Sequence, residues 1–157
     1  MTAQLGEHTH VRIRRAEPAD FAAVSALLLE AKLPTDGLDE QFGPAYAVAE
    51  SEGRVVGAQG IEQYDGAGLL RSAVVDFAFR GHGIGEDLTH NRLEWARNAG
   101  LAEVWLLTTT AAEWFPRFGF ARANRADAPD ALQQSREFRE ACPASAVAMR
   151  LDLAQGV

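Results

Sequence analysis

The amino-acid sequence predicts one α/β (α+β) domain, and three observations support this fold class. Its 157 residues fit a single domain and suffice to enclose a hydrophobic core. Two hairpin signals, Ser51-Glu52-Gly53 and Asp65-Gly66-Ala67-Gly68, separate apolar runs. Between Leu69 and Leu107, an apolar run, a glycine loop, a helix-like segment and a second apolar run form a βαβ unit. Strands and helices are therefore expected within one domain.

The first elements are a strand and a helix. Val11 to Arg15 alternates apolar and basic residues, which predicts a strand, and Pro18 is suited to the start of a helix. That helix has an apolar face at Phe21, Val24, Leu28 and Ala31. Lys32-Leu33-Pro34 ends it, because the residue before a proline disfavours helical geometry. The following loop carries a short helical piece before Gly43-Pro44 and is expected to line a substrate pocket.

The remaining elements alternate strand and helix signals. Four strands are expected, at Tyr46–Glu50, Arg54–Glu62, Leu69–Asp76 and Glu103–Leu107. The helix after the glycine loop is expected to end at Asn98-Ala99-Gly100, where glycine adopts a left-handed cap. Ala111–Phe118 has a helical pattern that Pro116 fits poorly, and Gly119-Phe120 leads into another strand. A weak helix at Ala128–Glu140 and an apolar strand at Ser145–Leu153 complete the chain.

The glycine loop, Arg80-Gly81-His82-Gly83-Ile84-Gly85, is the clearest functional motif. Its glycines remove side chains that keep anions away, so backbone N–H groups of the loop and the first helical turn can converge on phosphate. Glu86 replaces the third glycine of a dinucleotide-binding fingerprint, and Glu86-Asp87 replaces the lysine and hydroxyl residue of a nucleoside-triphosphate loop. A glycine-rich turn without a ligand is the alternative.

Composition limits the range of partners. A formal net charge of −7 and a pI near 5.1 argue against nucleic acid and anionic membrane surfaces, so a small molecule is the expected partner. The single cysteine excludes an intramolecular disulfide, and four scattered histidines give no spacing for structural zinc. Without an apolar leader or spanning run, a cytoplasmic protein is expected. Residues 1–10 are expected to form a flexible tail, followed by one domain at 11–157.

The order of elements, the R-x-x-G-x-G loop and the segment Trp114-Phe115-Pro116-Arg117-Phe118-Gly119-Phe120 resemble the GCN5-related N-acetyltransferase (GNAT) superfamily from about Val11 to Leu153. The resemblance implies a mixed central sheet, splayed between its fourth and fifth strands and covered by helices on both faces. It places acetyl-CoA in the gap, with no metal. The implied cofactor-binding residues are Val74, Val75, Arg80, Gly81, His82, Gly83, Ile84, Gly85 and Phe115. A solvent-facing role is the alternative for His82.

Three segments resemble, more specifically, the arsinothricin N-acetyltransferases of arsenic-resistance clusters. They are Leu70-Arg71-Ser72, Leu107 to Ala111, and Glu137 to Ala146. Acetyltransferases of the N-acetylglutamate-synthase type share part of the pattern. The implied reaction is acetyl transfer from acetyl-CoA to the amine of an amino-acid-like substrate of the arsinothricin, phosphinothricin or glutamate type, by direct attack. A homodimer through Ser145–Leu153 and Trp114 is one expected assembly, and a monomer is the alternative.

Two residues depart from the family pattern, and one of them concerns the general acid. Phe115 stands where most relatives carry a tyrosine that protonates the departing sulfur, and Thr108 stands where many have asparagine. A thiolate leaves without full protonation more readily than an alkoxide does, so catalysis remains chemically accessible. The general acid is therefore unassigned, and a CoA-binding sensor or interaction module without catalysis is the alternative function.

Amine acetylation requires a base for the ammonium group and donors for the developing oxyanion. Glu62 is the candidate base, because burial beside an apolar cleft favours proton uptake by a carboxylate, and an exposed charge is the alternative. Arg71 is expected to bind a substrate carboxylate, with a structural ion pair as the alternative. Ser72 is a second substrate-binding candidate, although in a regular strand it faces away from Arg71 unless a bulge intervenes. Thr109 is a further substrate-binding candidate, and Cys142 is expected to be a small buried hydrophobe.

Overall fold

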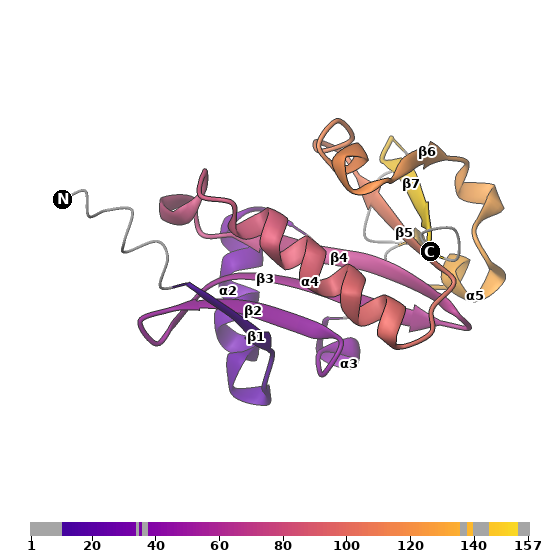
Figure 1. Cartoon of the computed structure of the whole chain (residues 1–157). Coiled ribbons are helices and arrows are strands. Elements are labelled where there is room, and N and C mark those ends of the chain that lie inside the picture. The colour runs from indigo at the N-terminus through magenta and orange to yellow at the C-terminus, as the bar shows by residue number, and fades with distance from the viewer. Residues whose placement is uncertain (1–10, 34, 36–37, 136–137, 140–144, 154–157) are drawn as a thin grey trace.

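A computed structural model describes residues 11–33, 35, 38–135, 138–139 and 145–153. The expected tail at 1–10 and the role expected for Cys142 lie outside these residues. The described strands are β1 (Arg12–Arg15), β2 (Tyr46–Ser51), β3 (Arg54–Tyr64), β4 (Ala67–Val75), β5 (Glu103–Thr108), β6 (Ala121–Ala123) and β7 (Val147–Asp152). They form one sheet in the order β1-β2-β3-β4-β5-β7-β6 (Figure 1).

The sheet is mixed, as expected. Its β4–β5 pair is parallel and its other neighbouring pairs are antiparallel. Both predicted hairpins are present, because Glu52-Gly53 and Asp65-Gly66 adopt positive φ angles, the geometry of a tight two-residue turn. The strands β4 and β5 pair at only three positions, from Ala67↔Glu103 to Leu69↔Trp105. Beyond these positions they diverge, so the predicted splay between the fourth and fifth strands is confirmed (Figure 1).

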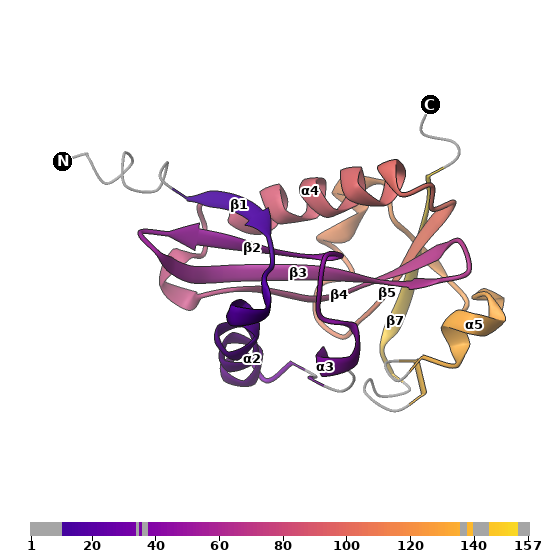
Figure 2. The same cartoon turned by 90° about the horizontal axis from the view of Figure 1, so that it is seen from below.

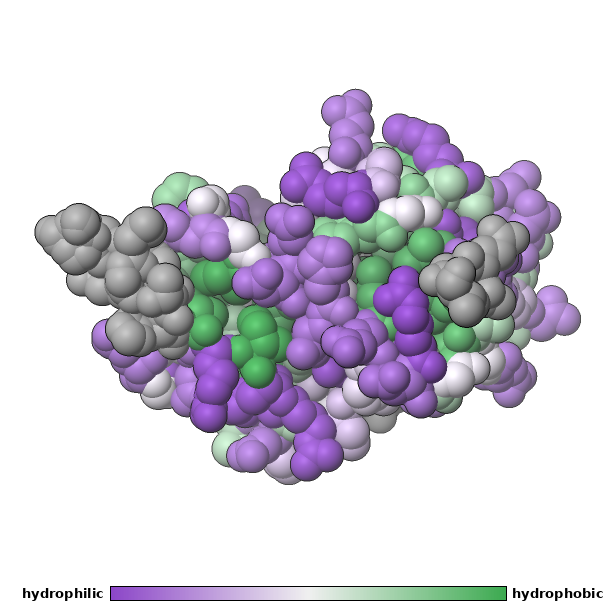
Figure 3. All heavy atoms as spheres, viewed as in Figure 1, coloured by the Kyte–Doolittle hydropathy of each residue, from purple (hydrophilic) through white to green (hydrophobic). Residues whose placement is uncertain are grey.

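Helices cover both faces of the sheet. The α-helices are α2 (Phe21–Glu30), α3 (Leu38–Gln41), α4 (Ile84–Asn98) and α5 (Asp130–Gln133). The 3-10 helices are η1 (Pro18–Asp20), η2 (Phe77–Phe79), η3 (Phe115–Phe118) and η4 (Arg125–Asp127). Figure 2 shows α2 and α4 on opposite sides of β2, β3 and β4. The outer face of α4 is hydrophilic (Figure 3), which fits one helix face packed on the sheet and one in solvent.

Separate hydrophobic clusters fix the two helices. Val24, Leu27 and Leu28 of α2 pack with Tyr46, Val48 and Ala58 on one face. Ile84 and Leu88 at the start of α4 pack with Ala47, Ala49 and Val56 on the other. The beginning of α4, where the glycine loop ends, is therefore anchored to the sheet.

Two sequence-based expectations about helices are corrected by the structure. The helix predicted at Ala111–Phe118 is a turn followed by the short η3, because Pro116 lacks the N–H that an α-helix needs and clashes with the preceding turn. In the described part of Ala128–Glu140, the α-helix comprises only Asp130–Gln133. The last strand, β7, pairs with β5 on one edge and with the short β6 on the other, and the homodimer expected through this strand and Trp114 stays a prediction.

Candidate functional site

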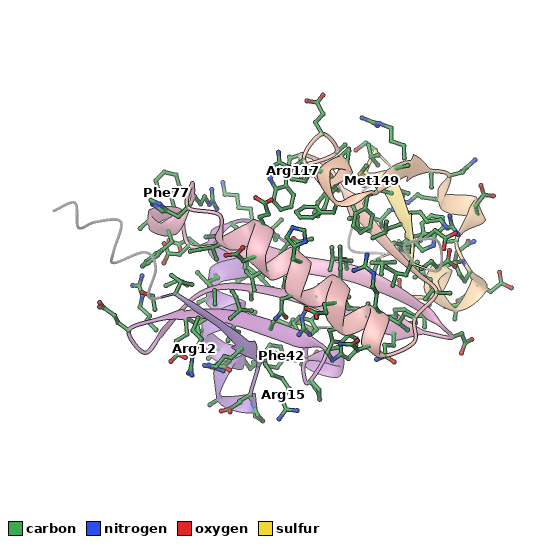
Figure 4. All side chains as sticks on the ribbon, in the orientation of Figure 1. Arg12, Arg15, Phe42, Phe77, Arg117 and Met149 are labelled. Carbon is green, nitrogen blue, oxygen red and sulfur yellow. The ribbon has the colours of Figure 1, made fainter. Side chains whose placement is uncertain are left out.

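A cavity of about 1000 Å³ occupies the splay between β4 and β5. Its walls are the second half of β4, the end of β5, the glycine loop with the first turn of α4, and residues 31–33 after α2. Figure 4 shows Phe77 of η2 and Arg117 of η3 on either side of the start of α4, and of these two Arg117 lines the cavity. Since the strands stop pairing at Leu69, sheet divergence creates this space.

The glycine loop has the backbone geometry that anion binding requires. Gly81 and Gly83 have φ angles of 84° and 82°, a left-handed conformation that side chains oppose, and Gly83 is the N-cap of α4. A Cβ built on either residue meets no atom of the described structure within 4 Å. The first N–H groups of α4 lack intrahelical acceptors, so they are available to an anion at the helix N-terminus. Ile84 and Gly85 line the cavity, whereas His82 is exposed and is absent from its lining.

Arg80 joins the loop to the end of β4. Its Nε donates to the Val75 carbonyl at 3.0 Å, and its guanidinium lies 5.4 Å from the centroid of the Phe77 ring. The Asp76 N–H donates to Val56 in β3 at 2.7 Å. Because N–H groups alternate between the two edges of a strand, the Val75 N–H points to the opposite edge, toward the gap. The Val75 N–H is thus a backbone donor at the gap between β4 and β5, while the Val75 carbonyl accepts the hydrogen bond from Arg80.

A β-bulge changes which residues of β4 face the cavity. Ser72 has a φ angle of 61°, and the β3–β4 register passes from Ala58↔Val74 to Gly60↔Arg71. The extra residue lies on β4, so Arg71 and Ser72 both line the cavity, and Arg71 Nε donates to Ser72 Oγ at 3.1 Å. The regular-strand expectation that they face opposite sides is therefore wrong.

Arg71 belongs to a buried hydrogen-bonded ion pair. Its Nη1 donates to Glu62 Oε2 at 3.1 Å, and the two side chains are 1% and 3% exposed. The other carboxylate oxygen accepts the Tyr64 hydroxyl at 2.6 Å. Burial, and then the bond to Glu62, raise the pKa of Tyr64, which keeps this hydroxyl a donor. Glu62 is absent from the residues that line the cavity, and its carboxylate is engaged by a cation and a phenol.

A second set of linked hydrogen bonds, from Gln59 through Thr89 to Gly85, was not predicted from the sequence. Gln59 is 1% exposed and lines the cavity, and its Nε2 donates to Thr89 Oγ1 at 2.9 Å. The Thr89 hydroxyl donates to the Gly85 carbonyl at 2.9 Å, which ties the first turn of α4 to the cavity wall. Gln59 Oε1 has no hydrogen-bond partner in the described part of the chain. The available sequence signal was one amide side chain within the otherwise apolar stretch Val55–Ile61.

The opposite wall ends in a hydroxyl-capped turn and an aromatic cluster. Thr108 Oγ1 accepts the Ala111 N–H at 2.9 Å, so Thr108 shapes the turn after β5. Thr109 is exposed and lines the cavity. Phe115 is 7% exposed, lines the cavity and packs edge-on against Trp114, with ring centroids 5.0 Å apart. This end of the cavity is therefore lined by an apolar ring, which has no proton to donate.

Charge in the cavity opposes the charge of the whole protein. The chain has a net charge of −7, yet the charged residues that line the cavity are Lys32, Arg71, Arg80, Arg117 and Glu86. With Arg71 paired to Glu62, three further cations against one carboxylate still favour anionic ligands. Lys32, expected only to end a helix, was not predicted as a site residue.

Neither a metal centre nor a membrane helix is found in the described residues. Among them, no group of three or more His, Cys, Asp or Glu side chains is placed to hold a metal ion. No helix in the same part of the chain is long and apolar enough to span a membrane.

Residues 43–122, about half of the chain, match the model of the acetyltransferase (GNAT) domain family. The amino-acid acetyltransferase of Mycobacterium tuberculosis is 34% identical over 119 residues, which are 69% of this chain and 67% of that protein. Rv2747 from the same organism, solved in complex with CoA, is 26% identical with a TM-score of 0.76 and covers 90% of this chain and 99% of its own.

The fold also matches N-acetylglutamate synthase from Neisseria gonorrhoeae, solved with coenzyme A and N-acetyl-glutamate. The TM-score is 0.78 at 21% identity over 91% of this chain, which corresponds to 35% of that protein, so the chain spans about a third of the synthase. Escherichia coli YhbS, solved with CoA, gives a TM-score of 0.69 at 22% identity over 92% of this chain and 82% of its own. The chain therefore belongs to the GNAT family of acetyl-CoA-dependent acetyltransferases.

Proposed function

We propose that this protein acetylates the α-amine of a small amino-acid-like acceptor that carries a carboxylate, of the glutamate, phosphinothricin or arsinothricin type. One observation carries the proposal. The cavity between β4 and β5 joins an anion-binding glycine loop at one end to Arg71 and Ser72 at the other. A phosphate-bearing acyl donor could thus bind at the glycine-loop end of the cavity, and a carboxylate-bearing amine at the end with Arg71 and Ser72.

The donor end suits acetyl-CoA, which supplies an acyl group activated as a thioester. Gly81, Gly83 and Gly85 leave room at the N-terminus of α4 for a diphosphate, and Arg80 adds a cation. The cosubstrate arm would then follow Val74 and Val75 along the diverging edge of β4. Phe115 would pack against it as an apolar surface. His82, on the exposed side of the loop, would approach a phosphate only from solvent.

The acceptor end assigns different tasks to the other residues. Arg71 binds the acceptor carboxylate, Ser72 and Thr109 offer hydroxyls, and the Val75 N–H faces the gap as an oxyanion donor. We propose that Glu62, first considered as the base, instead holds Arg71 in place, since its carboxylate lies behind the guanidinium. The acceptor amine would then enter the reaction already deprotonated or lose its proton to water.

The relatives support an amino-acid acceptor. One is named an amino-acid acetyltransferase, and another was solved with N-acetyl-glutamate. Acetylation would remove the positive charge of an amino-acid antimetabolite, so a detoxifying role, including arsenic resistance, is consistent with the proposed acceptors. Such a role would operate in the cytoplasm.

The test is amine-dependent release of free thiol from acetyl-CoA. The acceptor panel contains glutamate, phosphinothricin, arsinothricin and a simple alkylamine that lacks a carboxylate. The proposal expects thiol release with at least one amino acid and a much higher KM for the alkylamine. Acetyl-CoA binding, measured by thermal shift, without thiol release with any acceptor would instead support the CoA-binding sensor or module, a function that Phe115 in place of a phenol favours.

A further inference from the structure

We propose that Lys32 is a specificity-determining residue that binds a second anionic group of the acceptor, so that the substrate class is α-amino acids with an acidic side chain. This inference rests on the proposed function, because it assumes that Arg71 takes the α-carboxylate. Lys32 lies at the end of α2 and lines the same cavity as Arg71, which lies on β4. The two cations thus belong to different elements that border one space.

The backbone of Lys32 adopts a conformation that a lysine disfavours. Its φ angle is 61°, in the left-handed region. The Lys32 N–H donates to the Leu29 carbonyl at 3.1 Å, and the Leu33 N–H donates to the Leu28 carbonyl at 2.9 Å. These two bonds form the Schellman motif that ends helices, in which the left-handed position is usually glycine. Glycine would therefore end α2 with less backbone strain than lysine does.

The location of strained residues points to the cavity. Four non-glycine residues of the described chain have positive φ angles: Lys32, Glu52, Asp65 and Ser72. Glu52 and Asp65 occupy the two hairpin turns, where this geometry is required to reverse the chain. Lys32 and Ser72 line the cavity from α2 and β4. Ser72 lies inside β4 and Lys32 in the exposed turn that ends α2, so two of the four left-handed side chains border the ligand space.

The charges that line the cavity give Lys32 a distinct task. The guanidinium of Arg71 is paired with Glu62, so their charges balance within the protein. Lys32 is the only lysine of the chain, and Glu86, at the glycine-loop end, is the carboxylate among the described residues that line the cavity. A cation near the last turn also interacts favourably with the helix dipole. A lysine one turn earlier would provide that effect without left-handed strain, so the dipole alone does not account for Lys32.

An acceptor with two acidic groups and one amine matches this arrangement. Its α-carboxylate would bind Arg71, its side-chain acid would bind Lys32, and its amine would lie between them beside the end of β4. A cavity of about 1000 Å³ accommodates such a molecule together with the acyl end of the donor. Glutamine is the matched neutral probe, because it differs from glutamate only in the side-chain amide.

The experiment compares kcat/KM for glutamate and glutamine in wild type and variants. Lys32→Gly should lower the glutamate-to-glutamine ratio roughly tenfold, the usual effect of losing one charged hydrogen bond, and raise Tm. Lys32→Arg should retain most of the ratio. The matched control is Glu52→Gly, which relieves left-handed geometry in the β2–β3 turn and should raise Tm without altering the ratio. Lys32→Asn, which removes the charge but tolerates the left-handed region, is the second variant should Lys32→Gly fail to fold.

Binding supplies a readout that is independent of turnover. Calorimetry with CoA-loaded protein should show a roughly tenfold higher Kd for glutamate in Lys32→Gly than in wild type. A ratio and a Kd that stay within twofold of wild type in both charge-removing variants would overturn the role of Lys32. So would a wild-type preference for glutamine. If wild type acetylates no amino acid, the proposed function itself fails, which is distinct from acetylation that ignores Lys32.

Discussion

The buried pair between Arg71 and Glu62 allows a quantitative prediction about stability. The joined atoms are 3.1 Å apart, and the side chains are 1% and 3% exposed. At an effective dielectric constant of about 20, two unit charges at this distance attract by about 5 kcal/mol before desolvation is deducted. Removing one partner of a buried pair leaves an uncompensated charge, which typically costs about 3–5 kcal/mol.

Glu62→Gln and Arg71→Met should each lower the free energy of unfolding by about 3 kcal/mol. In a protein of this size that corresponds to a fall in Tm of about 6 to 12 °C. The double variant, which buries no unpaired charge, should lose less than about 3 kcal/mol instead of the sum of about 6 kcal/mol. The two sites would then be coupled by at least about 3 kcal/mol.

Urea unfolding followed by circular dichroism, at pH 7 and moderate salt, measures all four proteins of this cycle. The slope of free energy against denaturant must stay constant, so that the comparison reflects stability alone. If the double variant lost the sum of the two single losses within about 0.5 kcal/mol, the reasoning would be refuted, because this is how closely the effects of independent sites add. The result would mean that water or another group already compensates Arg71 in the folded protein.

Two further predictions concern the glycine loop and the loss of stability at acid pH. Gly83→Ala and Gly53→Ala each put a Cβ on a left-handed residue in open space, so each should lower the free energy of unfolding by about 1 kcal/mol. Only Gly83→Ala should also weaken acetyl-CoA binding, measured by calorimetry. If both variants bind acetyl-CoA with the same affinity, the glycine loop is not part of the donor site. Two hydrogen bonds from Arg14 lower the pKa of Asp20 in the folded protein. The stability that this pair contributes is therefore complete above about pH 4, the ordinary pKa of an aspartate, and is lost as the pH falls through the lower pKa of folded Asp20. Asp20→Asn should make the free energy of unfolding depend less on pH in this acid range.

The parts of the fold that the sequence predicts well depend on local chemistry. Asp65-Gly66 and Glu52-Gly53 specify tight turns because their two positions need positive φ angles, and the glycine loop starts α4 for the same reason. The splay followed from family resemblance rather than from local pattern. Pro116 gave a correct warning, since the helix predicted around it forms only a short 3-10 turn.

The parts that the sequence did not predict depend on contacts between distant residues. Nothing local requires Ser72 to be left-handed, and the bulge arises from the register between β3 and β4. That bulge turns both Arg71 and Ser72 toward the cavity and places Gln59 opposite the extra residue. Likewise, Glu62 and Arg71 are nine residues apart and meet only because the hairpin pairs their strands. Alternation along a single strand could not reveal either arrangement.

Two kinds of destabilising feature meet at the same cavity. A buried ion pair seldom stabilises a protein more than a well-packed apolar pair does, and a left-handed lysine is less stable than glycine at the same helix end. Both border the same cavity, which Arg71 lines from β4 and Lys32 from the turn that ends α2. Proteins that bind charged substrates give up stability where the binding groups are held. Stabilising substitutions at Lys32 should therefore reduce discrimination between acceptors, and a gain in Tm with full discrimination would break this link.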